Sequence, residues 1–117
     1  MTAKFWYSDS GTDVVAALVE KASGKLLHEF VKAEIFEPLG MNQTVYGFRT
    51  DDKMFSTFAS LYMGKPGKWT RYWQAHQRAF YPFAWGSQSI YSTTTDYAKF
   101  LNMIGNQGRV GDRQILV

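Results

Sequence analysis

The stretch FWYSDSGTDVVAALVEKASG, residues 5–24, decides how the first part of this 117-residue chain folds. Its apolar residues recur at helical spacing and predict an amphipathic helix with a stripe made of Val14, Val15, Leu18, Val19 and Ala22. An aromatic hydroxyl, a hydroxyl and a carboxylate (Tyr7, Ser8 and Asp9) stand directly before that helix. Such a triplet can cap the helix, or it can form one corner of an active site whose other corners lie elsewhere.

The boundaries of this helix and the course of the next one can also be predicted. Ser10 or Thr12 is expected to cap the first helix, and the glycine of Ser23-Gly24 is expected to end it. The pattern KLLHEFVKAEIF, residues 25–36, predicts a second helix with the apolar stripe Leu27, Phe30, Val31 and Ile35. The short junction between the two predicts a helical hairpin.

The middle of the chain contains turn and strand patterns. Residues 38–47 predict a turn followed by a short extended piece. Two β-prone runs, residues 55–63 and 68–73, flank Pro66-Gly67, a pair suited to a type II turn, and together they predict a β-hairpin. The aromatic-rich residues 74–89 lack periodicity and are interpreted as a long loop that lines a site or a partner surface.

A last helix is predicted over residues 92–104. Ser92 or Thr93 is expected to cap it, and Asp96 suits its first turn. Its predicted apolar stripe consists of Tyr97, Phe100, Leu101 and Ile104. A glycine-rich turn then leads to the end of the chain.

Composition indicates one modest globular unit, with 45% hydrophobic and 17% aromatic residues. The net charge of +3 does not by itself argue for nucleic acid or membrane, and the absence of cysteine excludes disulfides and thiolate metal sites. No apolar run reaches the ~20 residues of a membrane span, and no signal-peptide pattern is seen, so the compartment stays open. The apolar residues at 115–117 indicate a fragment, which can pair with itself to cover its cut surface.

No serine of this chain has the surroundings of an activated nucleophile. The signatures Gly-x-Ser-x-Gly and Ser-x-x-Lys are both absent, and the nearest approaches, residues 23–25 and 50–53, are interpreted as turn sequence. Tyr7 is a different matter, because a phenol can act as a base when cations hold it as phenolate. The alternative is that Tyr7 anchors the chain to the core while Asp9 or Ser10 caps the helix.

Neither a metal site nor a cofactor site is predicted. His28 and His76 lie far apart, neither pairs with another ligand type at helical spacing, and His28 is interpreted as a solvent-facing helix residue. Residues 65–81 interleave aromatics with the cations Lys65, Lys68, Arg71 and Arg78, a pattern that can bind single-stranded nucleic acid or sugars. The low net charge favours instead a hairpin whose aromatics face the core and whose cations face water.

Several short motifs recur in a characteristic order. Tyr7-Ser8-Asp9, Ser23-Gly24, Pro38-Leu39-Gly40-Met41 and Thr44 come first, and Gly86, Ser92-Thr93, Asp96-Tyr97, Phe100 and residues 108–116 follow. Together they resemble the serine β-lactamase and penicillin-binding-protein-like family, which includes esterases and D-amino peptidases related to class C β-lactamases. Each motif alone is weak, and their order and spacing carry the resemblance.

The resemblance implies roles for two residues of the opening triplet. Tyr7 would be the acid/base that shuttles a proton to and from a serine nucleophile, and Asp9 would orient the groups around the lysine of Ser-x-x-Lys. Asp9 stands where class C β-lactamases have asparagine, which favours esterase or peptidase activity over β-lactam hydrolysis. The Ser-x-x-Lys motif would lie upstream of Tyr7 and the Lys/His-x-Gly motif downstream of residue 116, so this chain lacks both.

Residues 1–117 are therefore expected to be a central fragment with an α+β fold, mainly the helical subdomain with a small antiparallel hairpin and without most of the core sheet. The parent enzyme would act without a cofactor, through an acyl-enzyme, on an ester, a β-lactam or a D-amino-acid peptide, and such enzymes are often periplasmic or secreted. The isolated chain is expected to be inactive. The alternative is a non-catalytic module whose residues 65–85 bind a carbohydrate, a nucleic acid or a protein.

Overall fold

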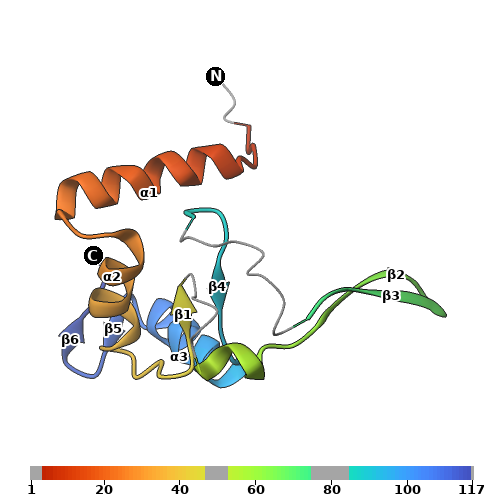
Figure 1. Cartoon of the computed structure of the whole chain (residues 1–117). Helices are drawn as coiled ribbons and strands as arrows, with labels where there is room; N and C mark the ends of the chain where they lie inside the picture. Colours follow the sequence, from red (N-terminus) through yellow and green to blue (C-terminus); the bar gives the residue numbers. More distant parts are fainter. Residues whose placement is uncertain (1–3, 47–52, 75–84, 117) are drawn as a thin grey trace.

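The computed structural model describes residues 4–46, 53–74 and 85–116. Within these ranges the helical elements are α1 (Asp9–Ser23), α2 (Leu27–Val31), the π-helical turn η1 (Lys32–Phe36), the 3-10 turn η2 (Lys53–Thr57) and α3 (Thr94–Gly105). The strands are β1 (Val45–Tyr46), β2 (Leu61–Lys65), β3 (Lys68–Trp73), β4 (Ile90–Tyr91), β5 (Arg109–Val110) and β6 (Arg113–Gln114). Figure 1 shows α1 above the other elements, with α2 descending from its C-terminal end.

The strands pair into small antiparallel sheets. Across the described ranges the pairs are β1–β4, β2–β3 and β5–β6, and each sheet has two strands. The β1–β4 pair places Val45 opposite Tyr91 and so joins distant parts of the chain. Helices combined with small antiparallel hairpins confirm the predicted α+β class.

Helix α1 begins earlier than predicted. Its N-cap is Ser8, which has extended backbone and whose Oγ accepts a hydrogen bond from the Gly11 amide at 3.0 Å. The prediction that Ser10 or Thr12 caps the helix is wrong, because Ser8 already satisfies an amide of the first turn. Gly24 ends the helix as predicted, with φ of 70° and an amide that donates to the Glu20 carbonyl.

The apolar stripe of α1 faces solvent. Val14, Val15 and Leu18 are 62%, 58% and 59% exposed, and α1 has no buried residue. The helix is held at its C-terminal end, where the Leu27 amide donates to the Glu20 carboxylate at 2.8 Å. The sequence thus predicted the helix correctly, but no element among the described residues covers its apolar face.

The hydrophobic core lies between η1, the loop that follows it, and α3. Its buried members are Phe36, Leu39, Met41 and Met103. Partly buried side chains surround it: Val31, Ile35, Tyr46, Phe100 and Ile115. Val31 and Ile35 were predicted to form a buried stripe with Leu27, and the predicted second helix is present as α2 continued by η1.

Helix α3 begins after Thr93, whose Oγ1 accepts a hydrogen bond from the Asp96 amide at 3.2 Å. Its buried residues are Asp96 and Met103, which lie seven positions apart and therefore share one face. The predicted stripe is largely wrong, because Tyr97, Leu101 and Ile104 are about half exposed. Asp96 points inward because the loop after η1 binds its carboxylate through Gln43 and Thr44, as described below.

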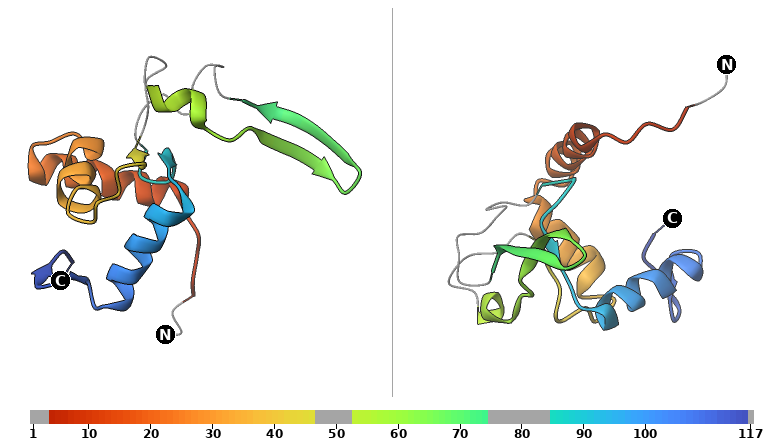
Figure 2. Two further views of the ribbon diagram at one scale, coloured as in Figure 1. Left: turned by 90° about the horizontal axis from the view of Figure 1, so that it is seen from below. Right: turned by 90° about the vertical axis from the view of Figure 1, so that its right-hand side faces the viewer.

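The predicted hairpin is present, although its first strand is shorter than expected. Residues 53–57 form η2 instead of a strand, and the Thr57 hydroxyl donates to the Met54 carbonyl at 2.7 Å. Gly67 has φ of 80°, as the third position of a type II turn requires. Figure 2 shows the hairpin extending away from the helices. The radius of gyration is 16.6 Å, whereas a compact domain of this length has about 13 Å.

Candidate functional site

The predicted acid/base, Tyr7, lies at the exposed N-terminal side of α1. Its side chain is 75% exposed, and the neighbouring Phe5 and Trp6 are more exposed still. The alternative that Tyr7 anchors the chain to a core therefore has no support in the described residues. Ser8 caps the helix between the two predicted site residues, so the same short stretch begins α1 and carries Tyr7 and Asp9.

Asp9 determines the acidity of Tyr7. By accepting a hydrogen bond from the phenol, and by its negative charge, Asp9 raises the pKa of Tyr7 above its ordinary value of 10.0. The raised pKa makes the Tyr7 phenol a weaker acid than an ordinary tyrosine, and both are protonated near neutral pH. To act as a base, Tyr7 needs a cation close enough to outweigh the Asp9 carboxylate.

A turn made of residues 85–89 docks onto the first turns of α1. The Asp13 carboxylate accepts two hydrogen bonds from Ser87, at 3.0 Å from the amide and 2.9 Å from the hydroxyl. Gly86 lies so close to the helix backbone that a Cβ there would be 2.2 Å from the Thr12 carbonyl oxygen. No side chain larger than that of glycine fits at position 86 without a shift of the backbone. The turn is held against the part of α1 that follows the triplet.

Tyr46 of strand β1 supports the same turn. Its hydroxyl donates to the Trp85 carbonyl at 2.6 Å. Burial, and secondarily the Asp13 charge, raise the pKa of Tyr46 above its ordinary value, so the phenol stays a donor. Strand β1, the 85–89 turn and α1 are thus joined by polar contacts at the base of the candidate site.

A second polar cluster joins α3 to the loop after η1. The Asp96 carboxylate accepts hydrogen bonds from the Gln43 amide at 2.7 Å, the Thr44 hydroxyl at 3.1 Å and the Lys99 ammonium at 2.8 Å. Thr44 also shares a hydrogen bond of 2.8 Å with the Ser92 hydroxyl. Asp96 is buried, and every one of these partners is a donor or can be one.

The pKa of Asp96 is lowered from its ordinary value of 3.8. The Lys99 hydrogen bond is the largest cause; burial acts in the opposite direction, and the Gln43 and Thr44 bonds lower the pKa further. The motif residues Thr44, Ser92 and Asp96 are therefore explained by one structural cluster. Its role is to hold the loop and α3 together.

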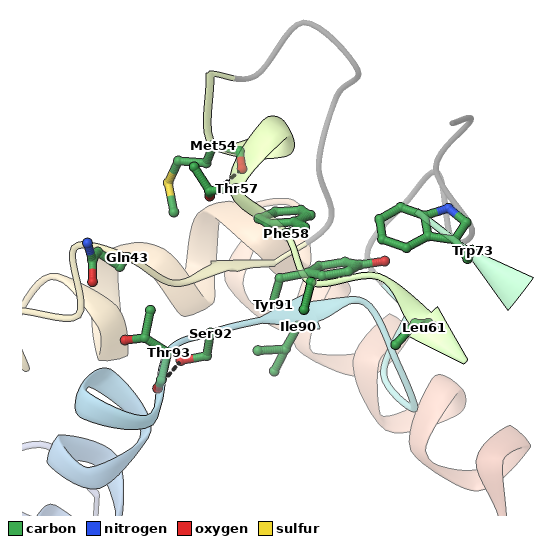
Figure 3. Close-up of a pocket in the computed structure, with 11 residues that line it drawn as sticks. Gln43, Met54, Thr57, Phe58, Leu61, Trp73, Ile90, Tyr91, Ser92 and Thr93 are labelled. Carbon is green, nitrogen blue, oxygen red and sulfur yellow. Dashed lines mark hydrogen bonds between the residues drawn. The ribbon is translucent and has the colours of Figure 1, made fainter. Parts of the chain in front are cut away.

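A pocket with a volume of about 540 Å³ lies between η2, the base of the β2–β3 hairpin, strand β4 and the start of α3. Figure 3 shows the Phe58 and Tyr91 rings stacked on one another in it, with Trp73 at one side. The two ring centroids are 4.6 Å apart. Tyr7 and Asp9 do not line this pocket, so the structure does not bring the predicted catalytic pair to it.

The aromatic residues of the hairpin, apart from Trp73, do not face a core. Trp69 and Tyr72 are 60% and 46% exposed, and Trp73 is the buried aromatic of β3. The interpretation of an amphipathic hairpin with inward aromatics is therefore wrong for most of the described strand. His76, Arg78, Phe80 and Tyr81, which belonged to the same predicted surface, lie outside the described residues.

The described residues contain neither a cluster of metal ligands nor a membrane-spanning helix. No group of three or more potential ligands among His, Cys, Asp and Glu is found in the described part of the chain. His28 is exposed on α2, as predicted. Across the described ranges, no helix has the length and hydropathy needed to cross a bilayer.

Comparison with known proteins identifies the family to which this chain belongs. The beta-lactamase family model matches residues 2–117, so the chain belongs to the beta-lactamase family. A 58-residue part is 40% identical to penicillin-binding protein 4* of Bacillus subtilis (strain 168); the match covers 49% of this chain and 13% of that protein.

Solved structures show the same fold. The octameric penicillin-binding protein homologue from Pyrococcus abyssi is 28% identical, with a TM-score of 0.71 over 97% of this chain and 23% of that one. The D-amino acid amidase from Ochrobactrum anthropi SV3 is 26% identical, with a TM-score of 0.70 over 94% of this chain and 31% of that one. The chain thus spans at most about a third of the relatives described here.

Some residues of the site were not found from the sequence. Asp13 has the pattern of an ordinary acidic residue near a helix start, and nothing local shows that Ser87 is its partner. Phe58, Trp73 and Tyr91 come from three segments, and only folding brings them together. The one usable signal was Gly86, a family motif residue whose small size the close approach to α1 requires.

Proposed function

We propose that residues 1–117 are the central part of a serine hydrolase domain in which Tyr7 transfers protons during acyl transfer and Asp9 orients the neighbouring groups. The observation that carries this is the family match over residues 2–117 together with the exposed position of Tyr7 at the start of α1. The exposed position of the phenol would let it reach the leaving group of a substrate, as a general acid must.

The reaction would proceed by serine attack on an amide or ester carbonyl, formation of an acyl-enzyme and hydrolysis by water. The serine and its lysine would come from polypeptide outside residues 1–117. A lysine ammonium close to Tyr7 would lower the phenol pKa against the effect of Asp9, which makes the same group an acid and a base in turn. The family model supports a β-lactam as substrate, and the D-amino acid amidase named above supports a D-amino acid amide; an ester is the third candidate.

The isolated chain is expected to lack this activity. Without Ser-x-x-Lys no covalent acyl-enzyme can form, and a fluorophosphonate or penicillin probe should leave the purified polypeptide unlabelled. The exposed apolar face of α1 is the surface that the remainder of the domain would cover. In the isolated chain this face gives a reason for self-association.

A chimaera tests the roles of Tyr7 and Asp9. Residues 4–116 would replace the matching segment of the Pyrococcus abyssi homologue, whose chain would supply the rest of the domain, and ester and penicillin hydrolysis would be measured. Tyr7→Phe should lower kcat about 10²–10⁴-fold, and Asp9→Asn should shift the pH profile. Tyr97→Phe, a half-exposed tyrosine on α3, is the matched control. Equal kcat values for the two tyrosine variants would remove Tyr7 from the mechanism.

A second candidate is a binding module that uses residues 65–85. The exposed Trp69 beside Lys68 favours it, because an aromatic ring with nearby cations can stack on a sugar or a base. Binding of single-stranded oligonucleotides should then weaken steeply with salt. Titration at low salt tests it, and absence of binding there removes the nucleic-acid version.

A further inference from the structure

The β2–β3 hairpin is exposed on both faces. The side chains of Tyr62, Met63 and Trp69 are 55%, 59% and 60% exposed, and its buried residue is Trp73 at its base. Among the described residues, no third strand pairs with either strand. A two-stranded hairpin alone in water is marginally stable, and three or more strands or a covering element are needed for independent stability.

The two edges of the hairpin differ in charge. Strand β3 carries Lys68 and Arg71, and charged side chains of this kind block the addition of another strand. Strand β2 is uncharged over residues 61–64 and carries its only charge, Lys65, at its end. The β2 edge is therefore the one open to strand addition.

We propose that the β2 edge pairs with the β2 edge of a second copy of this chain, in antiparallel orientation, to form a four-stranded sheet of order β3–β2–β2–β3. This surface is independent of the catalytic role of Tyr7, and the two proposals stand or fall separately. It also differs from the apolar face of α1, which the remainder of the domain would cover.

The distribution of charge on the hairpin favours an antiparallel orientation of the paired strands, and it favours a second copy of this chain as the partner of β2. A parallel arrangement would bring the Lys65 and Lys68 side chains of both copies together, and like charges directly opposite each other are destabilising. The antiparallel arrangement puts these cationic tips at opposite ends of the sheet, and it leaves Lys68 and Arg71 on the outer strands in water. An edge of uncharged, half-exposed side chains is complementary to itself.

The pairing has a defined register. With the two-fold axis at the middle residue of β2, Met63 lies opposite its counterpart, and Tyr62 lies opposite Gly64 of the other copy. An aromatic ring across from a glycine covers backbone that would otherwise be exposed, a known device for strengthening edge strands. Leu61 then lies opposite Lys65 of the other copy, which places no charge against a charge.

The absence of cysteine makes single-cysteine cross-linking the direct test. The Cα atoms of residues paired across antiparallel strands are about 4.5–5.5 Å apart, within the range that a disulfide spans. Oxidised Met63→Cys should therefore give a disulfide-linked dimer on a non-reducing gel. Thr70→Cys is the matched control, because Thr70 is the partner of Met63 within the hairpin. Across three strand spacings its counterpart lies about 14 Å away, and no dimer should form.

Repeating the cross-linking with a substitution on α1 distinguishes association through the β2 edge from association through the apolar face of α1. Both cysteine variants would be repeated with Leu18→Lys, which places a charge on the exposed apolar face of α1. The dimer of Met63→Cys should persist there. Three results would each overturn the proposal: loss of the Met63→Cys dimer when Leu18→Lys is present, equal cross-linking of Thr70→Cys, or no dimer with either cysteine variant. The last result would favour an acidic protein or a nucleic acid as the partner of the hairpin.

Sedimentation of lysine variants tests the same interface without cysteine, so that a disulfide formed by chance collision cannot be mistaken for a dimer. Together with Leu18→Lys, which disfavours association through α1, Tyr62→Lys adds a charge to the β2 edge and should abolish the dimer in sedimentation velocity. In the same background, Thr70→Lys adds the same charge to β3 and should leave the dimer unchanged. If both lysine variants sediment like Leu18→Lys alone, the β2 edge is not the interface.

Discussion

Two regions of this molecule have equally regular sequence patterns but very different environments. The first is the packed unit made of η1, the loop after it and α3, where Met103 is 1% exposed. The second consists of α1 and the β2–β3 hairpin, where the apolar side chains are mostly half exposed or more. The first region has its covering partners within the described residues, whereas the second does not.

This difference teaches that a periodic pattern specifies a surface to be buried, and not what buries it. Helix α1 was predicted correctly, and Leu18 of its predicted apolar stripe is nevertheless 59% exposed. In the packed region the partner is a buried carboxylate: Asp96 binds the loop amide of Gln43 and turns α3 onto the core. The stability of the chain should therefore depend almost entirely on the first region.

The largest effect is expected for Met103→Ala. This change removes a fully buried side chain and should cost about 2–5 kcal/mol of unfolding free energy, measured by urea denaturation followed by circular dichroism. Leu101→Ala lies on the same helix and is half exposed, so it should change stability by less than about 0.5 kcal/mol. Similar costs for both variants would contradict the position of the core.

Asp96→Asn should have the next largest effect. It removes the charge that binds Lys99 and Gln43 and should cost about 1–3 kcal/mol near neutral pH. The pKa of Asp96 is lowered in the folded state, so its contribution is fully present above the ordinary value of 3.8 and is lost as the pH falls through the lowered value.

The pH dependence separates this charge effect from a packing defect. The difference between the unsubstituted chain and Asp96→Asn should shrink as the pH is lowered below about 4. Asp112→Asn, in the exposed turn between β5 and β6, is the control and should be neutral throughout. A cost of Asp96→Asn that stays constant down to acid pH would show that the charge contributes nothing.

Gly86→Ala tests the contact between the 85–89 turn and α1. Its Cβ would meet the Thr12 carbonyl oxygen at 2.2 Å, so the turn must move and weaken the Ser87–Asp13 bonds, at a cost of about 1–3 kcal/mol. The change should appear in amide hydrogen exchange of Ser87 while the core amides keep their protection. Gly105→Ala has open space around it and should leave exchange at Ser87 unchanged.

Local chemistry was sufficient to predict several features of this fold. Gly24 as the end of α1, Thr93 as a cap of α3 and the Pro66-Gly67 turn follow from backbone preferences of individual residues. The cap of α1 was missed by two residues, because Ser8, Ser10 and Thr12 are chemically equivalent candidates. Which hydroxyl serves depends on where the backbone leaves the extended region.

The tertiary contacts could not be predicted in the same way. Asp96 is bound by residues more than fifty positions away, and Asp13 by a serine 74 positions away. Nothing in a single sequence identifies such partners. The predicted stripe of α3 failed for this reason: hydrophobicity alone placed Tyr97 and Leu101 inside, whereas the buried carboxylate determines the face that turns inward.

The smallest effect in the isolated chain is expected for Leu18→Lys, and it sharpens the comparison most. Because Leu18 already faces solvent, its replacement should change the unfolding free energy by less than about 0.5 kcal/mol. In the chimaera described above, the same face would be covered, and a buried lysine there should cost several kcal/mol and lower the melting temperature. Neutrality in both contexts would show that the stripe of α1 is exposed in the complete domain as well, and that its apolar residues have a different partner.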